Sequence, residues 1–441
     1  MRAGDSAGTL SVESPGDRDG DESLRPPTRS ALFARPRVPR ARPGGKRLAR
    51  PGRSIPPVEG LTQFVAAPGA IDLAWGHPDP ELLPVAELRA ATTRALDRYG
   101  PDMLAYGHPL GPRPLREWIG QRLAETDARA PAPDEIVITG GTSQGLDMVA
   151  TLLMSPDDAI LVGEPTYHLA VRILADHPVA MHGLASDGEG VLLDDLQRVV
   201  RELRQGGTQR LFLYTIPTFN NPTGTSLPDD RRRALVDFAA AAGLVIVEDD
   251  TYRELAYDGP APASLWAIAA PGTVVRLGSF AKSVAPGLRC GYVTADAPTA
   301  ARFALSGFLD SGGSPSHFSA LVLAEYAAAG DYARGVERYR AAYRERRDAL
   351  LASLAAQLGA TRWDTPKGGY FVWVPLPDGI TADALAGAAE RCGTGFVPAS
   401  VFYVHPERAP EAIRLSFARY PPELLAEAGG RLGRAIEMVT G

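Results

Sequence analysis

Residues 211–224 read LFLYTIPTFNNPTG, residues 244–252 read LVIVEDDTY, and residues 274–289 read VVRLGSFAKSVAPGLR. Each segment begins with a short apolar run, which is typical of a buried strand, and ends in polar or ionisable residues. Amphipathic helical stretches separate such runs between about residues 134 and 295. This alternation predicts an α/β fold in which helices cover a sheet.

Two more apolar runs extend the same pattern. Residues 135–139 (EIVIT) lead into GGTSQG at 140–145, and residues 159–163 (AILVG) lead into EPTY at 164–167. In open α/β sheets, ligands bind outside the carboxyl ends of the strands. Five strand ends that carry glycine, polar or ionisable residues therefore predict one shared pocket.

The pattern becomes mainly helical after about residue 303. We expect helices at 320–328, 331–358 and 423–439, and strands at 370–375 and 412–417. These elements predict a second, smaller α+β domain. The expected division is a tail at 1–55, a segment at 56–100 that contributes to the small domain, a large domain at 101–315 and the C-terminal small domain at 316–441.

The first 55 residues have an unusual composition. Residues 1–24 hold six acidic residues, and residues 25–53 hold ten basic residues among many prolines. Such a segment buries too little apolar surface to offset its ordering entropy. We expect a disordered tail, or a start codon placed too far upstream, rather than a basic arm that binds nucleic acid or membrane.

Composition excludes several classes of protein. The chain has 441 residues, a net charge of −6 and 45% hydrophobic residues, which suits a soluble globular protein and argues against nucleic-acid binding. We find no apolar run of about 18 residues, as a membrane span requires. Two cysteines, Cys290 and Cys392, exclude a disulfide framework and a thiolate zinc site, so we expect no metal centre and a cytoplasmic protein.

The glycine-rich turn at 140–145 has two readings. Its backbone amides, at the start of a helix, suit a phosphate group. It also matches the G-x-S-x-G nucleophile elbow of α/β-hydrolases through Ser143, with Asp249 or Asp250 and His317 or His405 following in the right order. A serine hydrolase is therefore a distant alternative.

Three other features favour different chemistry. Lys282 is one of only three lysines and directly follows an apolar strand, where burial and a nearby cation lower an amine's pKa and allow it to form an imine. Asp249 and Asp250 end a buried strand and need a cationic partner, such as a protonated heterocyclic nitrogen. Arg289 follows in a short loop and suits a phosphate.

These motifs, in this order and spacing, resemble pyridoxal-phosphate enzymes of the aspartate aminotransferase fold (fold type I, class I/II). The resemblance is greatest to the branch of 2-aminoadipate, kynurenine and aromatic amino-acid aminotransferases, and it extends from about Ile71 to the C-terminus. It implies a mixed, mostly parallel seven-stranded sheet between helices, plus a smaller α+β domain. It also implies pyridoxal 5′-phosphate as cofactor, an α-amino acid and a 2-oxo acid as substrates, and a homodimer with shared active sites.

The resemblance also implies roles for single residues around the cofactor ring. Lys282 would form the internal aldimine and move the α-proton in a ping-pong reaction. Asp249 would keep the pyridine nitrogen protonated, which makes the ring an electron sink. Tyr252 and Asn221 would bind its phenolic oxygen, and Tyr167 would stack on its face.

Other residues would hold the phosphate and the substrate. The resemblance assigns the phosphate to Ser143, Gln144, Ser279, Arg289 and, from the neighbouring subunit, Tyr106. It assigns the substrate to Gly76, Asn221 and Arg414, of which Arg414 would bind the α-carboxylate.

The sequence departs from the family pattern at three positions. Ala281 stands where many relatives have a second serine, and His77 and His108 stand where relatives often have other residues; we expect structural roles for these histidines. The same cofactor also supports a lyase, a side-chain replacement enzyme or an oxidase, which stay as alternatives to an aminotransferase. The sequence does not determine the side chain of the substrate.

Overall fold

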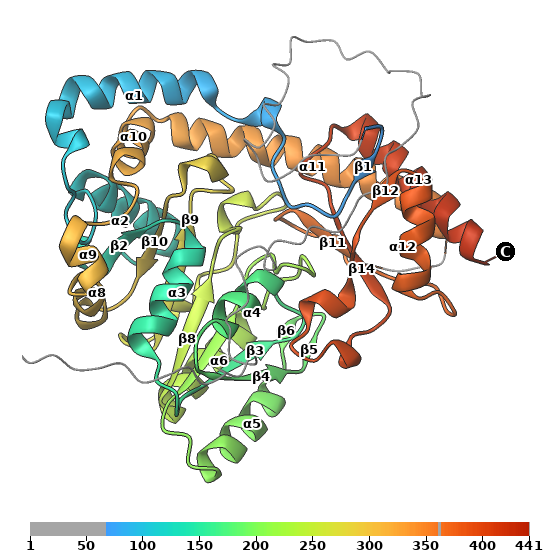
Figure 1. The fold of residues 1–441 in the computed structure, drawn as a ribbon, viewed down its shortest axis with the longest axis horizontal. Helices are drawn as coiled ribbons and strands as arrows, with labels where there is room; N and C mark the ends of the chain where they lie inside the picture. Colours follow the sequence, from blue (N-terminus) through green and yellow to red (C-terminus); the bar gives the residue numbers. More distant parts are fainter. Residues whose placement is uncertain (1–67, 360–362, 441) are drawn as a thin grey trace, which may run out of the picture. The chain divides into compact units, whose positions relative to one another are not determined.

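A seven-stranded sheet in the order β2-β10-β9-β8-β7-β3-β4 carries the predicted apolar runs (Figure 1). The computed structural model describes residues 68–359 and 363–440, so the predicted tail at 1–55 lies outside the described residues. All neighbouring strands are parallel except β10, which is antiparallel to β2 and to β9. The strands are β2 (Ile136–Thr139), β3 (Ala159–Gly163), β4 (Ala180–Leu184), β7 (Leu211–Thr215), β8 (Leu244–Asp249), β9 (Val274–Ser279) and β10 (Gly291–Thr294).

Helices cover both faces of this sheet because its strands are apolar on both sides. In β7, Phe212 and Tyr214 belong to a buried cluster with α3, α4 and α8, whereas Leu211 and Leu213 belong to a second cluster with α5, α6 and α7. This is the two-residue alternation of a strand buried on both faces. The helices are α3 (Thr142–Leu153), α4 (His168–Ala175), α5 (Leu193–Gln205), α6 (Asp229–Ala242), α7 (Leu265–Ile268) and α8 (Ala297–Ala304).

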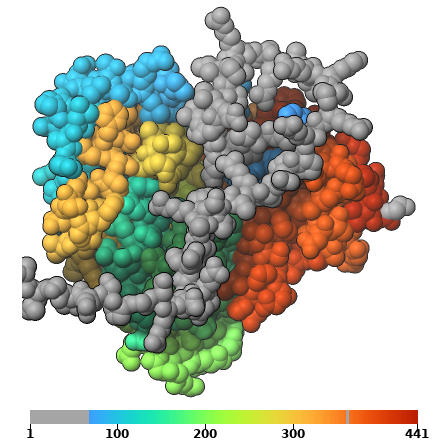
Figure 2. Space-filling view, in the orientation of Figure 1, coloured from blue at the N-terminus to red at the C-terminus, as the bar shows by residue number. Residues whose placement is uncertain are grey.

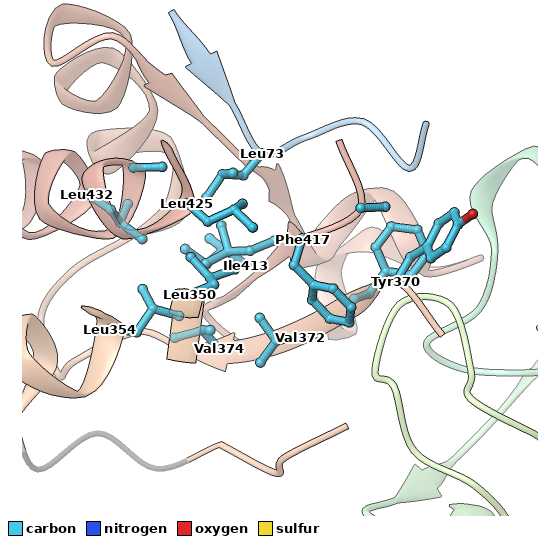
Figure 3. Close-up of a cluster of buried hydrophobic side chains, with 14 of the residues drawn as sticks. Leu73, Leu350, Leu354, Tyr370, Val372, Val374, Ile413, Phe417, Leu425 and Leu432 are labelled. Atoms are coloured by element: carbon cyan, nitrogen blue, oxygen red, sulfur yellow. The ribbon is translucent and has the colours of Figure 1, made fainter. Parts of the chain in front are cut away.

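A second, smaller sheet forms a separate core. Its three strands, β11, β14 and β13, are antiparallel, and they pack with α11, α12 and α13. Figure 3 shows side chains of this core, including Leu350, Val372 and Ile413. The elements are β11 (Phe371–Pro375), β13 (Val397–Pro398), β14 (Ala412–Ser416), α11 (Asp331–Leu358), α12 (Ala382–Arg391) and α13 (Pro422–Thr440).

The segment before α1 joins this small core. β1 pairs in parallel with β12, and Leu73 lies in the same cluster as Leu350. The predicted fold class, an α/β sheet between helices plus a smaller α+β part, is thus confirmed. The domain boundaries at residues 55, 100 and 315 stay predictions. The short strands are β1 (Ile71–Asp72), β5 (Ser186–Asp187), β6 (Gly190–Val191) and β12 (Thr394–Gly395).

The remaining helices cover the β2 side of the large sheet. They are α1 (Val85–Tyr99), α2 (Arg113–Asp127), α9 (Gly307–Gly312) and α10 (His317–Ala328). α1 packs along α10, as the contact between blue and orange atoms in Figure 2 shows. Of the helices that the structure describes, none combines the length and the apolar character that a membrane crossing needs.

The antiparallel strand β10 brings the ends of β2 and β9 together. Gly291 is in register with Thr139 of β2 on one side and with Ser279 of β9 on the other. A Cβ atom on Gly291 would lie 2.7 Å from the carbonyl oxygen of Gly278 and 2.9 Å from the Cα atom of Gly141. Both are backbone atoms, which no side-chain rotation can move away, so this close approach requires glycine.

We therefore predict that Gly291→Ala lowers the free energy of unfolding by about 1–3 kcal/mol, the usual cost of overpacking a core. The measurement is urea unfolding of the full chain. Gly287→Ala is the matched control, because a Cβ atom there meets nothing within 4 Å. Equal stabilities of the two variants would contradict the close approach at Gly291.

Candidate active site

The predicted strand ends meet at one edge of the large sheet. β2, β9, β8, β7 and β3 all point toward this edge, and the antiparallel strand β10 begins there (Figure 1). The register of β8 with β9 pairs Asp249 with Leu277, so residues after the two strands continue from neighbouring points. The edge therefore collects the side chains that the sequence predicts for one pocket.

Lys282 follows β9 and lies against the segment between β1 and α1. Its Nζ donates a hydrogen bond to the carbonyl oxygen of Gly76 at 2.9 Å and lies 5.2 Å from the ring centre of Tyr370. Burial, and then the positive charges of Arg414 and Arg289, lower the pKa of Lys282 to about 8, against the opposing effect of Asp249. An appreciable share of this amine is neutral near pH 7, as a nucleophile or base requires.

Asp249, the last residue of β8, is a buried carboxylate held by two hydroxyl groups. Tyr214 donates to Oδ2 at 2.9 Å, and Thr251 donates to Oδ1 at 2.6 Å. Burial raises the pKa of Asp249, while these hydrogen bonds act in the opposite direction. Within the described residues, no lysine or arginine forms an ion pair with it.

The adjacent Asp250 belongs to a different network. Its Oδ2 pairs with Nη2 of Arg276 at 2.7 Å, and the same guanidinium bonds Asp127 at 2.8 Å. Asp127 in turn pairs with Arg253 at 2.7 Å. Breaking a buried pair of this kind costs about 3–5 kcal/mol of stability, so Asp250 has a structural role as a partner of Arg276. Of the two carboxylates, Asp249 is the one available for a cationic ligand.

Arg414 brings a buried positive charge from β14 to the same pocket. Its Nη1 donates to Oδ1 of Asn221 at 3.0 Å, its Nη2 donates to the carbonyl oxygen of Ala74, and its guanidinium carbon lies 4.2 Å from the ring centre of Phe371. Burial lowers the pKa of Arg414 to about 10. Among the described residues no carboxylate pairs with it, and its Nε has no partner. The group therefore suits an anionic ligand.

The start of α3 forms a positively charged cradle. The N-cap of this helix is Gly141, which has no side chain to cap it and has a φ of 98°. Arg289 donates from Nη2 to the carbonyl oxygen of Gly140 at 2.9 Å, and a Cβ atom on Gly141 would lie 2.9 Å from the same nitrogen. Backbone amides of a helix N-terminus beside a guanidinium suit a phosphate group.

The other predicted phosphate residues lie around this cradle. Ser143 and Gln144 are in the first turn of α3, and Oε1 of Gln144 accepts a hydrogen bond from the amide of Gly140 at 2.6 Å. Ser279 ends β9, and its hydroxyl oxygen accepts from the backbone N–H of Ala281 at 3.1 Å. Ala281 contributes only this backbone contact.

Tyr252 and Tyr167 complete the group of residues that the fold brings together. Tyr252 is buried beside Tyr370, with 5.5 Å between their ring centres. Tyr167 immediately precedes α4 and is partly buried. Burial is the main cause that raises the pKa of both hydroxyls, and the charge of Asp249 adds to it. Both tyrosines therefore stay protonated and are available as hydrogen-bond donors near Asp249.

Tyr106 and His108 are not part of this group. Tyr106 is 89% exposed and, within the described residues of one chain, does not bond to the cradle at α3. His108 stabilises a turn instead: its Nδ1 accepts from the amide of Leu110 at 3.1 Å, and its carbonyl oxygen accepts from Ser314 at 3.1 Å. His77 follows Gly76, and burial and the charges of Lys282 and Arg419 lower its pKa to about 4, so it is neutral.

The serine triad of the hydrolase alternative is not assembled in the described part of the chain. Asp249 bonds Tyr214 and Thr251 rather than a histidine. Nε2 of His317 lies 3.1 Å from the carbonyl oxygen of Asp102, and Nδ1 of His405 lies 3.6 Å from Oε1 of Glu407. Ser143 therefore lacks the acid-to-base hydrogen bond that activates a serine nucleophile.

Sequence reasoning misses three contributors to the site. Tyr214, Phe371 and Ala74 contact Asp249 and Arg414 as described above, but only Tyr214 carries a sequence signal, its place in the YTIP motif at 214–217. Phe371 and Ala74 contribute a ring face and a backbone carbonyl, which have no motif of their own.

The pKa of Lys282 leads to a prediction for the enzyme stripped of bound ligands. Labelling of Lys282 by an amine-reactive reagent, followed by peptide mass across pH, is expected to have its midpoint near pH 8. Arg414→Gln removes a positive charge that disfavours the protonated amine, so the midpoint moves upward. Arg408→Gln, an exposed arginine that is not among the charges acting on Lys282, is the control. An unchanged midpoint in Arg414→Gln would refute the coupling.

Comparisons with known proteins agree with this geometry. The family model for aminotransferase class I and II matches residues 69–432. The chain is 30% identical over 392 residues to aromatic-amino-acid aminotransferase 1 of Thermococcus litoralis. This alignment covers 88% of the chain and 92% of the relative. It is 33% identical over 386 residues to a 2-aminoadipate transaminase of Thermus thermophilus, with 86% and 92% covered.

A solved structure is similar as well. The kynurenine aminotransferase of Pyrococcus horikoshii, crystallised in complex with PMP, superposes with a TM-score of 0.79 at 30% identity over 84% of this chain and 91% of that chain. The chain therefore belongs to the class I and II aminotransferases, pyridoxal-phosphate-dependent enzymes that transfer an amino group from an α-amino acid to a 2-oxo acid.

Proposed function

We propose that the transfer takes place in the pocket formed by Lys282, Asp249 and Arg414. The observation that carries this proposal is the buried guanidinium of Arg414, which has no carboxylate partner among the described residues and lies close enough to lower the pKa of Lys282. An amino acid supplies the missing carboxylate, and its α-carbon is then held near an amine that is partly neutral.

The residues fit pyridoxal 5′-phosphate. Asp249 is a buried carboxylate whose hydrogen-bond donors among the described side chains are neutral hydroxyl groups, which suits a protonated ring nitrogen. A Cβ atom on Gly141 would fill the space beside Arg289 that a phosphate needs. Lys282 would hold the aldehyde carbon, Tyr252 and Asn221 the phenolic oxygen, and Tyr167 a ring face. When bound, the cofactor withdraws electrons from the α-carbon of an attached amino acid.

The chain's own groups then position the substrate and move a proton. Arg414 binds the α-carboxylate, and its bonds to Asn221 and Ala74 fix the guanidinium, so the α-carbon is oriented. The neutral Nζ of Lys282 would accept the α-proton and would later donate it again. The carbonyl oxygen of Gly76 orients this amine between the two steps, at 2.9 Å.

The choice of amino acid is supported only by the relatives. Their named substrates are aromatic amino acids, 2-aminoadipate and kynurenine, which share a long side chain. We propose a substrate of this kind. Trp75, adjacent to Gly76 and 41% exposed, offers an aromatic surface for such a side chain.

We further propose a homodimer in which Tyr106 reaches the phosphate of the neighbouring subunit. Tyr106 is solvent-exposed in one chain, as are Leu104, Leu305 and Phe308. A Cβ atom on Gly312, at the end of α9, would lie 3.8 Å from the ring of Tyr106, so α9 and Tyr106 are neighbours. Exposed apolar groups on adjoining segments favour a protein interface.

The scarcity of cysteine supports a cytoplasmic enzyme.

Substitution of the lysine tests the central assignment. Lys282→Ala is expected to abolish turnover and the borohydride-stable mass addition of the cofactor, because the other lysine among the described residues, Lys367, is exposed. The visible spectrum, recorded before and after borohydride and then with a panel that begins with aromatic amino acids, 2-aminoadipate and kynurenine, is the measurement. Lys367→Ala, at an exposed lysine, is the control. Undiminished turnover in Lys282→Ala would refute the proposal.

The shared site leads to a complementation test. Tyr106→Ala and Lys282→Ala dimers are each expected to have low activity. Mixing and re-association yield hybrid dimers in which one of the two sites has both native residues, so activity rises on mixing. Steady-state assays with sedimentation velocity measure this. If mixing leaves activity unchanged although hybrids form, Tyr106 does not act across the interface.

A further inference from the structure

Tyr214 is a fully buried tyrosine of β7 whose hydroxyl group bonds the candidate site. Its ring belongs to the buried cluster between the large sheet and α3, together with the ring of Phe212 two residues earlier. The hydroxyl group donates to Oδ2 of Asp249 at 2.9 Å. Burying a polar group is costly unless it is hydrogen-bonded, so this contact is the reason for a tyrosine here.

The surroundings of Asp249 make this bond consequential. Its two oxygens each accept from a neutral hydroxyl group, Tyr214 on one and Thr251 on the other. The other titratable groups that act on it are Asp250, Tyr167, Tyr252 and Lys282. Burial favours the protonated form of Asp249, and the two hydroxyl donors oppose it.

A neutral donor leaves the charge of the carboxylate available to a ligand, whereas a charged donor does not. Arg276 neutralises Asp250 permanently, and that carboxylate is thereby withdrawn from any ligand. A hydroxyl donor stabilises the carboxylate and fixes its orientation but leaves its negative charge uncompensated. Burial and the charge of Asp249 raise the pKa of Tyr214 well above its usual value, so the hydroxyl remains a donor throughout the physiological range.

We infer that Tyr214 is a positioning residue that holds Asp249 ionised and oriented toward the ring nitrogen of the cofactor, with Thr251 supporting the second oxygen. The inference rests on the proposed role of Asp249. It predicts that the hydroxyl group of Tyr214 contributes to binding only when the ligand has a ring nitrogen to protonate.

Cofactor affinity provides the test, independently of turnover. The full-length enzyme, stripped of cofactor, is titrated with pyridoxal 5′-phosphate and with its deaza analogue, in which a CH group replaces the ring nitrogen. Tyr214→Phe is expected to weaken binding of pyridoxal 5′-phosphate about tenfold, the typical effect of losing one hydrogen bond to a charged group, and to leave the analogue unaffected. Thr251→Val, which removes the second donor, is expected to act in the same direction and carries the test if Tyr214→Phe does not fold.

Two further variants make each outcome decisive. Tyr326→Phe, which removes a buried hydroxyl group of α10 that has no hydrogen-bond partner in the described part of the chain, should leave both affinities unchanged. Asp249→Asn should weaken pyridoxal 5′-phosphate far more than the analogue; if it weakens both equally, the proposed role of Asp249 fails. If Asp249→Asn discriminates between the ligands but Tyr214→Phe and Thr251→Val weaken both equally or neither, only the inference on Tyr214 is overturned.

Discussion

The hydrogen bond from Arg414 to Asn221 links the two sheets of this protein at the candidate site. Arg414 belongs to β14 of the three-stranded sheet, and Asn221 follows β7 of the seven-stranded sheet. A buried guanidinium needs partners, and this one takes them from the loop after β7 and from the segment before α1. These contacts hold a charge that has no carboxylate partner among the described residues.

The same charge adds to burial in lowering the pKa of Lys282. Arg414 and Arg289 both disfavour the protonated form of Lys282, and Asp249 partly opposes them. In the proposed function the same cation would also attract an anionic substrate. The carboxylate of that substrate would offset the charge of Arg414 and thereby alter the proton affinity of Lys282.

The sequence predicts the fold class and the five strand ends because both depend on local patterns. β3, β7, β8 and β9 begin at the predicted residues. The apolar runs do not predict β4 and β10. β4 (AMHGL) is half-exposed along most of its length, and β10 has four residues and begins with the glycine that the crowded edge requires. Contacts such as Arg414 to Ala74 link residues 340 positions apart, and only the assembled fold brings them together.

The sequence does not show which of the adjacent carboxylates Asp249 and Asp250 pairs with an arginine. The alternation of side chains along the strand determines this. Successive residues of a strand point to opposite faces, so Asp249 shares the face of Val247, whose register partner on β7 is Tyr214. Asp250 comes one residue later and shares the opposite face with Glu248. The carboxylate of Glu248 accepts hydrogen bonds from the backbone amides of Leu265 and Trp266 at the start of α7. Asp249 therefore meets hydroxyl donors, which leave its negative charge uncompensated, whereas Arg276 balances the charge of Asp250 in an ion pair. A shift of one residue in this strand would exchange the partners of the two carboxylates.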